Sequence, residues 1–314
     1  MLIVIVNYST PRLVIDCLRS LAPQITPATR VIITDNASPD DSVPQIQSAI
    51  AANHWSFAAL MPLPKNGGFA YGNNAAIRPL LAANQLPPYI LLLNPDTILL
   101  PNALAALTTF MDQNPQAAIA GSRLENPDAT PQISAFRFPG ILSEFESGFR
   151  LGLLTRLLSP IILAPPVQDV PHKTGWVAGA SFLVRREVFE KIGLLDEAYF
   201  MYYEEVDFCL RAARAGFATW YVPQSRVIHL VGQASGINSA AVRPKRTPAY
   251  VFQSRRRYFV KNHGRLYAFF ADAACLAAFS IYRLRRRLQR KPDTDPPHAL
   301  ADFARHSVCL HPRS

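Results

Sequence analysis

Short apolar runs alternate with longer helix-like stretches over the first 125 residues. This pattern predicts strands at 2–7, 31–35, 56–61 and 89–93, with intervening helices at 11–21, 43–52 and 71–83. The strands are apolar along their whole length, and a helix separates each from the next. Both features are typical of a parallel sheet that is covered by helices on its two faces. The sequence therefore predicts an α/β fold with a mostly parallel central sheet flanked by helices.

The second half of the chain has a less regular pattern. Residues 141–158 are compatible with an amphipathic helix or with a mobile flap, and 176–184 resembles a single strand kinked at Gly179. After these, the pattern predicts a helix at 204–216 that ends at a glycine, and two strands at 218–222 and 226–230. Two helix-like stretches follow, at 248–262 and at the apolar 266–282.

Positive charge is concentrated towards the C-terminus. The 314 residues have a formal net charge of +10, but residues 1–242 carry 16 Lys and Arg against 18 Asp and Glu. Residues 243–291 carry 14 basic side chains and a single acid, Asp272. Clustered basic residues beside an apolar helix favour binding to an anionic membrane surface. Nucleic acid is disfavoured, because it would bind the basic side chains but not the apolar ones. The stretch is short for a transmembrane span, and a soluble helical appendage is the alternative.

The cysteines and the N-terminus indicate the compartment. Cys17, Cys209, Cys275 and Cys309 are widely spaced, which disfavours a disulfide framework or a zinc knuckle and favours a reducing cytosol. Residues 1–8 have no basic segment before their apolar run, so we interpret them as a buried strand rather than a signal peptide.

Polar residues follow three of the predicted strands. These are Asp35 with Asn36, the turn Asn66-Gly67-Gly68, and Asn94-Pro95-Asp96. Ligands of such sheets bind at the carboxyl ends of the strands, so we expect these residues to share one edge. A carboxylate there can bind a ribose, a pyrimidine or a divalent cation, and a glycine-rich turn can bind phosphate. Each motif also has a plain explanation as a cap, a loop or a turn.

A second group of candidates lies after residue 200. Glu204, Glu205 and Asp207 place three carboxylates in four residues, directly after the aromatic run 199–203. Burial and mutual repulsion raise a carboxyl pKa towards the range of a general base, although acids also favour a helix N-terminus. His229 ends a predicted strand. It is either a core histidine or a nitrogen ligand that complements a carboxylate.

Taken in order, these motifs resemble the family 2 glycosyltransferases of the GT-A fold, in particular a rhamnosyltransferase-like branch that builds bacterial cell-surface polysaccharides. The likeness covers about residues 1–232 and rests on the motifs Ile5–Tyr8, Asp35–Ser38, Asn66–Phe69, Leu93–Asp96, Gly175–Gly179 and Glu204–Arg211. It implies a nucleotide-diphospho-sugar transferase fold with a catalytic domain at 1–242. That domain would have a nucleotide-binding half at 1–125 and an acceptor and catalytic half at 126–242. The charge distribution adds a basic amphipathic helical segment at 243–291, expected at a membrane surface, and a flexible tail at 292–314.

The resemblance also implies roles for single residues. The donor would be bound by Asp35, Asn36, Asn66, Gly67, Gly68 and Asn94. Asp96 and His229 would bind Mg²⁺ or Mn²⁺, Trp176 would lie near the acceptor, and Glu205 would be the catalytic base.

Two residues depart from the family pattern. Asn94 replaces the first acid of the DxD metal motif, of which Asp96 is the last. Glu205 stands where the family usually has the aspartate of an ED or DD pair. The longer side chain of Glu205 leaves Glu204 and Asp207 as alternative bases.

The activity that the resemblance implies is metal-dependent, inverting sugar transfer from a dTDP- or UDP-linked donor, with rhamnose as the suggested sugar. The acceptor would be a glycan or a lipid-linked glycan, and the protein would be cytoplasmic and peripheral on the inner face of the membrane. The two departures keep one alternative open, a catalytically impaired, transferase-like scaffold at the membrane. A nucleotidyltransferase is disfavoured because residues 7–10 are not a GxGxRL-type loop, and an NAD oxidoreductase because no GxGxxG opens the first helix.

Overall fold

The computed structural model describes residues 1–230 and 245–310, which form two compact units. The sheet unit comprises 1–136, 166–200 and 204–230, and the helical unit comprises 137–165, 201–203 and 245–310. The predicted domain boundary at 242 lies outside the described residues. Segment 137–165, which the sequence analysis assigns to the acceptor half, belongs to the helical unit.

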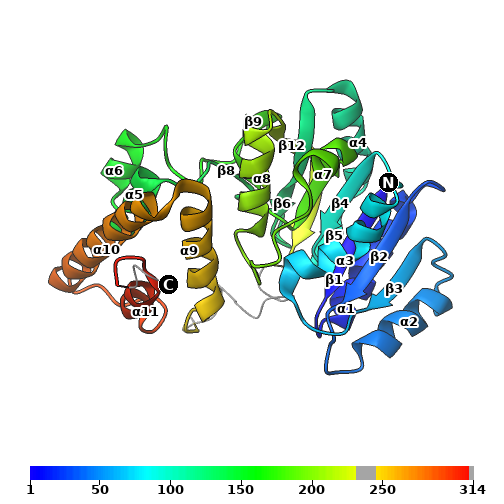
Figure 1. Cartoon of the computed structure of the whole chain (residues 1–314), viewed down its shortest axis with the longest axis horizontal. Helices are drawn as coiled ribbons and strands as arrows, with labels where there is room; N and C mark the ends of the chain where they lie inside the picture. Colours follow the sequence, from blue (N-terminus) through cyan, green and yellow to red (C-terminus); the bar gives the residue numbers. More distant parts are fainter. Residues whose placement is uncertain (231–244, 311–314) are drawn as a thin grey trace. The chain divides into compact units, whose positions relative to one another are not determined.

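The sheet unit is built on a mixed sheet (Figure 1). Its main strand order is β3-β2-β1-β4-β11-β6-β12-β5, in which β12 spans Ala218–His229 and β5 spans Thr97–Leu99. Four neighbouring strands are parallel, namely β1 (Leu2–Asn7), β2 (Arg30–Asp35), β3 (Ala58–Pro62) and β4 (Tyr89–Leu93). The next strand, β11 (Ser181–Arg185), is antiparallel to both β4 and β6 (Ala117–Glu125). The predicted parallel core is therefore confirmed for the first half of the chain.

The three helices predicted in the first 125 residues are present, and two further helices accompany them. They are α1 (Pro11–Leu21), the short η1 (Ala22–Gln24), α2 (Ser42–Ala52), α3 (Gly68–Ala82) and α4 (Ala103–Gln113). In α1 the buried residues Val14, Leu18 and Leu21 recur every three or four positions, which is the spacing of one helix face. Burying each such side chain contributes about 1.5–3 kcal/mol to folding, so this face fixes α1 on the sheet.

Two predicted strand assignments are wrong. Residues 176–184 are not one strand, because β10 (Trp176–Val177) pairs with β8 (Ala135–Phe136) in a separate two-stranded sheet. The predicted strands 218–222 and 226–230 are instead one strand, β12 (Ala218–His229). Its pairing with β6 shifts register between Val222 and Arg226. Pro223 lies in this interval and has no N–H to donate, which explains the break in the sequence pattern.

The remaining elements of the sheet unit are short, apart from helix α8. They are β5 (Thr97–Leu99), β7 (Pro131–Gln132), β9 (His172–Thr174), α7 (Arg186–Ile192) and α8 (Glu204–Arg214).

The helical unit contains α5 (Ile141–Phe149), α6 (Gly152–Leu157), α9 (Ala249–His263), α10 (Arg265–Leu288) and α11 (Ala299–His306). Segment 141–158 is therefore helical rather than a flap. A Cβ at Gly148 would lie 3.0 Å from Ala278 Cβ, so α5 and α10 pack closely. The predicted flexible tail contains α11, where Asp302 accepts hydrogen bonds of 2.7 and 2.6 Å from Arg246.

A buried ionic cluster joins the helices of this unit. Arg255 on α9 is 8% exposed and donates to Glu144 on α5, with Nη2–Oε2 at 2.8 Å, and also to Asp272 on α10. Asp272 in turn accepts the Val308 N–H at 2.6 Å. The single acid of the basic segment is therefore paired inside the unit.

Replacing Arg255 with Met is expected to lower the free energy of unfolding by about 3–5 kcal/mol, because two buried carboxylates lose their cation. Urea unfolding would measure the change. Arg287→Met, at an exposed position of α10, is the control and should unfold like the wild type. Equal midpoints for Arg255→Met and the control would show that the cluster adds no stability.

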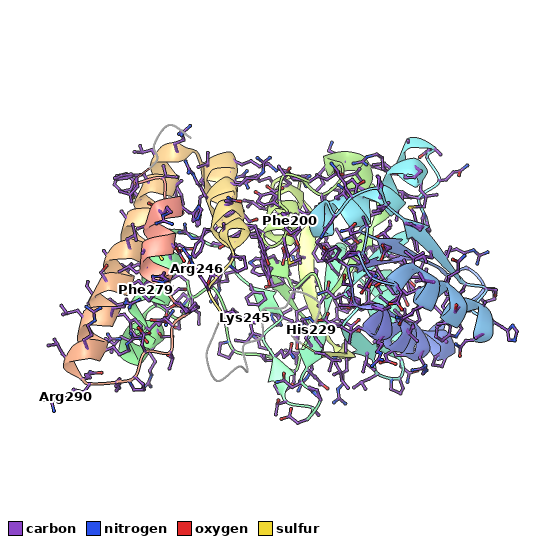
Figure 2. The ribbon with its side chains drawn as sticks, turned by 90° about the horizontal axis from the view of Figure 1, so that it is seen from below. Phe200, His229, Lys245, Arg246, Phe279 and Arg290 are labelled. Atoms are coloured by element: carbon purple, nitrogen blue, oxygen red, sulfur yellow. The ribbon has the colours of Figure 1, made fainter. Side chains whose placement is uncertain are left out.

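Helix α10 is long and apolar, and part of its surface is exposed. Among the described residues it is the one helix long and apolar enough to cross a membrane, although core helices of soluble proteins can have the same composition. One side of α10 packs on α5 and α9. Large apolar side chains remain exposed along it, namely Leu266, Phe269, Phe270, Ile281, Leu284 and Leu288. Phe279 is buried, whereas the exposed Arg290 lies just beyond the end of the helix (Figure 2).

Candidate functional site

The carboxyl ends of β1 and β2 are joined by hydrogen bonds to Asp35. Its Oδ2 accepts from Asn7 Nδ2 at 2.6 Å and from Ser38 Oγ at 2.7 Å, and its Oδ1 accepts from the Ser38 N–H at 2.9 Å. Asp35 is only 1% exposed. These three bonds occupy most of the roughly four acceptor positions of a carboxylate. Asp35 therefore holds the turn after β2, and its expected contact with a nucleoside stays a prediction.

Asn36 connects that turn to the glycine-rich turn. Its Nδ2 donates to Gly68 O at 2.9 Å and lies 3.4 Å from Asn66 Oδ1, which also accepts the Gly68 N–H at 3.1 Å. One residue further on, the Phe69 N–H donates to Phe200 O at 3.0 Å. These contacts bring the glycine-rich turn against both β2 and the segment that precedes α8.

The two glycines at the start of α3 have little room for a side chain. A Cβ at Gly67 would lie 2.4 Å from the ring of Tyr71. Gly68 has φ +85°, and a Cβ there would lie 1.8 Å from Phe200 O. Since that oxygen belongs to the backbone, it cannot move aside cheaply. The turn requires glycine at residue 68 for its conformation and for this close approach.

Gly68→Ala is therefore expected to lower the rate of the reaction supported by this site by about 100-fold, because small displacements of a site have effects of that size. Gly193→Ala is the matched control. Gly193 has a similar φ of +76°, with ψ −165°, and a Cβ there would meet nothing within 4 Å. Because this backbone region is essentially restricted to glycine, the alanine variant should lose about 1–3 kcal/mol of stability and keep its rate. Initial-rate and thermal-unfolding measurements on both variants would separate the effect of the clash with Phe200 O from the effect of the strained backbone conformation. Equal rates in the two variants would contradict this account.

The turn after β4 lies beside the same region. The Asn94 N–H donates to Ala180 O at 3.1 Å, and the Asn94 carbonyl accepts from Thr97 Oγ1 at 2.7 Å. A Cβ at Gly179 would lie 3.6 Å from the ring of Phe69. Residues 179 and 180 thus contact both turns, so the structure brings these candidate donor-binding residues to one edge of the sheet.

Asp96 and His229 lie next to each other. Asp96 Oδ1 is 3.5 Å from His229 Nε2, and the two side chains are 2% and 15% exposed. They are adjacent because β12 pairs antiparallel with β5, which places His229 opposite Thr97. Residues 1–230 and 245–310 contain no group of three or more His, Cys, Asp or Glu side chains that could hold a metal ion. Among the described residues, the His, Cys, Asp and Glu side chains available to a cation here are therefore those of Asp96 and His229.

The three acids of α8 have different surroundings. Asp207 is fully buried and forms an ion pair with Arg211 Nε at 2.9 Å, so its carboxylate has a structural role. Glu204 is 4% exposed, and burial together with the charge of Glu205 raises its pKa well above the ordinary value. Burial raises the pKa of Glu205 to about 7. Of the three, the partly exposed Glu205 is the one poised to exchange a proton near neutral pH.

The backbone before this helix is unusual. Tyr202 and Tyr203 have φ of +68° and +70°, a left-handed conformation that is uncommon for bulky residues and costs free energy. Such strain is often found at functional sites. The two residues in this conformation directly precede Glu204.

Trp176 lies in the small sheet formed by β8 and β10. Its ring stacks on Phe136 with centroids 4.2 Å apart and planes 14° apart. Helix α8 packs against β10. Trp176 is therefore held beside the helix that carries the three acids, and its expected contact with an acceptor stays a prediction.

Comparison with known proteins shows the family of the chain. The sequence profile of Glycosyl transferase family 2 matches residues 2–193. The chain belongs to this family. A relative of this family 2 enzyme is the N-acetylglucosaminyl-diphospho-decaprenol L-rhamnosyltransferase of Mycobacterium tuberculosis, 28% identical over 254 residues that cover 76% of this chain and 78% of the relative. Another is rhamnosyltransferase WbbL of Escherichia coli K12, 33% identical over 168 residues, with coverage of 52% and 60%.

Solved structures agree on the fold. A mannosyltransferase from Pyrobaculum calidifontis in complex with GDP-Man and Mn²⁺ has a TM-score of 0.57 and 14% identity, covering 100% of this chain and 87% of that one. GalNAc-T7 with UDP, GalNAc and Mn²⁺ has a TM-score of 0.58 and 14% identity, covering 97% and 54%. At this identity they show the fold alone, which is GT-A as predicted. The family 2 chain is thus a nucleotide-sugar glycosyltransferase.

Gln132 is a residue beside the site that the sequence does not predict. Gln132 lies 97 positions from His229, yet its side chain contacts that histidine. A glutamine next to a turn carries no signal for metal or sugar chemistry. The contact depends on the pairing of β7 and β12 with β6.

Proposed function

We propose that this family 2 glycosyltransferase transfers a sugar, with rhamnose as the first candidate, from a dTDP- or UDP-linked donor to a lipid-linked glycan with inversion. The observation that carries the proposal is Glu205, a carboxyl group whose burial raises its pKa to about 7 at the start of α8. The named activities of the relatives support the sugar and the lipid-linked acceptor.

The proposed reaction is one in-line displacement at the anomeric carbon. Ionised Glu205 accepts the proton of the acceptor hydroxyl while that oxygen bonds to the anomeric carbon. The bond from this carbon to the diphosphate breaks, and its electron pair leaves with the diphosphate. Because the hydroxyl attacks the face opposite the leaving group and no covalent enzyme intermediate forms, the anomeric configuration inverts.

We propose that Asp96 and His229 hold Mg²⁺ or Mn²⁺. Two ligand atoms at about 2.0–2.2 Å from one ion lie roughly 3 Å apart when adjacent in its coordination sphere, and the 3.5 Å between Oδ1 and Nε2 is close to this. Such ions are commonly bound through one or two protein side chains plus phosphates and water. When bound, the ion would neutralise charge on the departing diphosphate.

The role of Glu205 predicts the pH dependence. Its ionised form is the active one and its pKa is raised to about 7, so kcat/KM should increase with pH and level off above about 7. Rates measured between about pH 5 and 9 would give the profile. A Glu187→Gln control, at an exposed position of α7, should keep this profile. A plateau that already extends to pH 5 would exclude Glu205 as the base.

The donor and the stereochemistry can be tested together. Thermal-shift screening of dTDP- and UDP-sugars with Mn²⁺ should identify a stabilising donor, since a ligand that binds the folded state raises its stability. NMR of the product then reports the anomer. Retention would overturn the single-displacement proposal. Hydrolysis or transfer of the donor would exclude the catalytically impaired scaffold.

We also propose that the helical unit binds the anionic inner face of the cytoplasmic membrane through the exposed apolar face of α10. Leu266, Phe270 and Leu284 lie on that face, and basic residues cluster at its C-terminal end. Apolar area plus cationic charge is what such surfaces attract. In flotation with anionic vesicles the wild type should float and Phe270→Glu/Leu284→Glu should not. Val170→Glu, at an exposed apolar residue of the sheet unit, is the control. A wild type that stays at the bottom would overturn this part.

A further inference from the structure

The side-chain amide of Gln132 has a defined orientation. Its Nε2 donates to His229 O at 2.8 Å and to Asn126 Oδ1 at 2.8 Å, and it lies 3.3 Å from Glu125 O. The amide nitrogen has two hydrogens and no acceptor. Rotating the amide by 180° would place its oxygen against these oxygens, so the nitrogen must occupy this side.

The orientation of Gln132 determines which nitrogen of His229 carries a proton. Gln132 Oε1 lies 3.3 Å from His229 Nδ1. Because Oε1 is an acceptor, Nδ1 must be the donor, and in the neutral ring Nε2 then keeps its lone pair. That lone pair lies on the side of Asp96, whose Oδ1 is 3.5 Å away. Two electron-rich atoms at this distance favour a cation between them.

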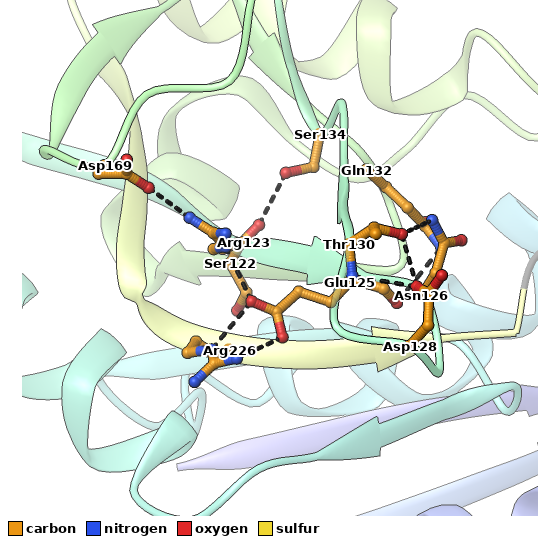
Figure 3. Close-up of polar contacts among 10 residues, drawn as sticks. All are labelled: Ser122, Arg123, Glu125, Asn126, Asp128, Thr130, Gln132, Ser134, Asp169 and Arg226. Carbon is orange, nitrogen blue, oxygen red and sulfur yellow. Dashed lines mark hydrogen bonds and ion pairs between the residues drawn. The ribbon is translucent and has the colours of Figure 1, made fainter.

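Gln132 lies on the hairpin formed by β6 and β7, whose residues are linked by hydrogen bonds (Figure 3). Strand β7 pairs antiparallel with β6, so that Gln132 lies opposite Leu124. In the connecting turn, the Asn126 N–H donates to Thr130 O at 2.8 Å and Asn126 Nδ2 donates to Thr130 Oγ1 at 2.9 Å. Asn126 therefore closes the turn and also accepts the hydrogen bond from Gln132.

Ion pairs stabilise the base of the hairpin. Glu125, at the end of β6, has a fully buried side chain and accepts from Arg123 Nε at 2.8 Å and from Arg226 Nε and Nη2 at 2.9 and 2.8 Å (Figure 3). Arg226 lies on β12, three residues before His229. The ion pairs therefore join β12, which carries His229, to β6, the strand with which the strand of Gln132 pairs.

We infer that Gln132 is a positioning residue that holds His229 in the Nδ1–H tautomer and so presents Nε2 to a divalent cation shared with Asp96. The inference rests on the proposed metal-dependent function. Residues that orient a metal-binding histidine in this way typically change metal affinity by about 10–100-fold when removed.

Two measurements test the inference. The first is ¹⁵N NMR of the histidine rings in the metal-free protein, with the His229 signals assigned by loss in His229→Asn. We expect the Nδ1–H tautomer in the wild type and a mixture of tautomers in Gln132→Met. The second is titration with Mn²⁺ in the presence of UDP, followed by the EPR signal of the free ion. Gln132→Met should bind Mn²⁺ about 10–100-fold more weakly than the wild type, and Gln45→Met, on α2, should bind it equally.

The outcomes distinguish the inference from the proposed function. An Nε2–H tautomer in wild-type protein, or unchanged Mn²⁺ affinity in Gln132→Met, would overturn the role of Gln132. A wild-type protein that shows the Nδ1–H tautomer but binds no Mn²⁺ would instead overturn the metal proposal and support the tautomer assignment. The wild-type spectrum gives its answer even if Gln132→Met does not fold.

Discussion

Replacing Glu205 with Gln is expected to lower the rate of sugar transfer by about 10²–10⁴-fold, the usual contribution of a general base. The amide has nearly the same shape but cannot accept the proton of the acceptor hydroxyl. Donor binding should stay close to wild type, because the carboxylate acts on the acceptor. Steady-state kinetics and donor titration by calorimetry would measure both quantities.

The same substitution has a second expected effect, on stability. Since burial raises the pKa of Glu205 to about 7, the folded protein above that pH holds an ionised carboxylate at a cost in folding free energy. The neutral amide of Glu205→Gln carries no such charge, so the variant should unfold at a higher temperature than the wild type at about pH 8, and the difference should shrink as the pH falls below 7. A variant that keeps wild-type turnover would remove Glu205 from the reaction, and Glu204→Gln would then be the next variant to measure.

Replacing Asp96 with Asn is expected to lower transfer by about 10³-fold, because a bound metal ion contributes several kcal/mol of charge stabilisation. In contrast to Glu205→Gln, this variant should also bind the donor weakly, since donor phosphates and the cation bind together. Calorimetric titration of the donor with and without Mn²⁺ would show the loss, with Mn²⁺ no longer increasing donor affinity.

Asp16→Asn is the matched control for this experiment. Asp16 is an exposed acid on α1 that pairs with Arg19 three residues away, and surface pairs of this kind contribute about 0–1 kcal/mol. Its kinetics should equal those of the wild type. If Asp96→Asn kept both its activity and the effect of Mn²⁺ on donor affinity, the assignment of the metal site to Asp96 and His229 would be wrong.

The amino-acid sequence predicts the first half of the fold closely, because local pattern and tertiary environment agree there. The predicted helix at 11–21 and the strands at 2–7 and 89–93 have the observed bounds. A fully buried parallel strand must be apolar throughout, and a helix on its face must repeat apolar residues every three or four positions. Both patterns can be read without knowing which elements touch.

Prediction fails where pairing partners decide the structure. Residues 176–184 have the composition of one strand, but Trp176 and Ser181 pair with different sheets. The two strands expected at 218–222 and 226–230 are one strand, because pairing with β6 continues on both sides of Pro223. Segment 137–165 belongs to the helical unit because α5 packs on α10, more than 100 positions away in the chain.

The candidate site shows the same division. The sequence alone determined the family, the types of residue at the carboxyl edge of the sheet, and the three acids at 204, 205 and 207. Only the tertiary structure showed that Asp207 is paired, that Glu204 is buried and that Glu205 can exchange a proton near neutral pH. The reason is that a carboxyl pKa depends on neighbouring groups that the sequence does not name. It also decided that His229 lies beside Asp96 and that Gln132 contacts the histidine, since strand pairing brings together side chains that are distant along the chain.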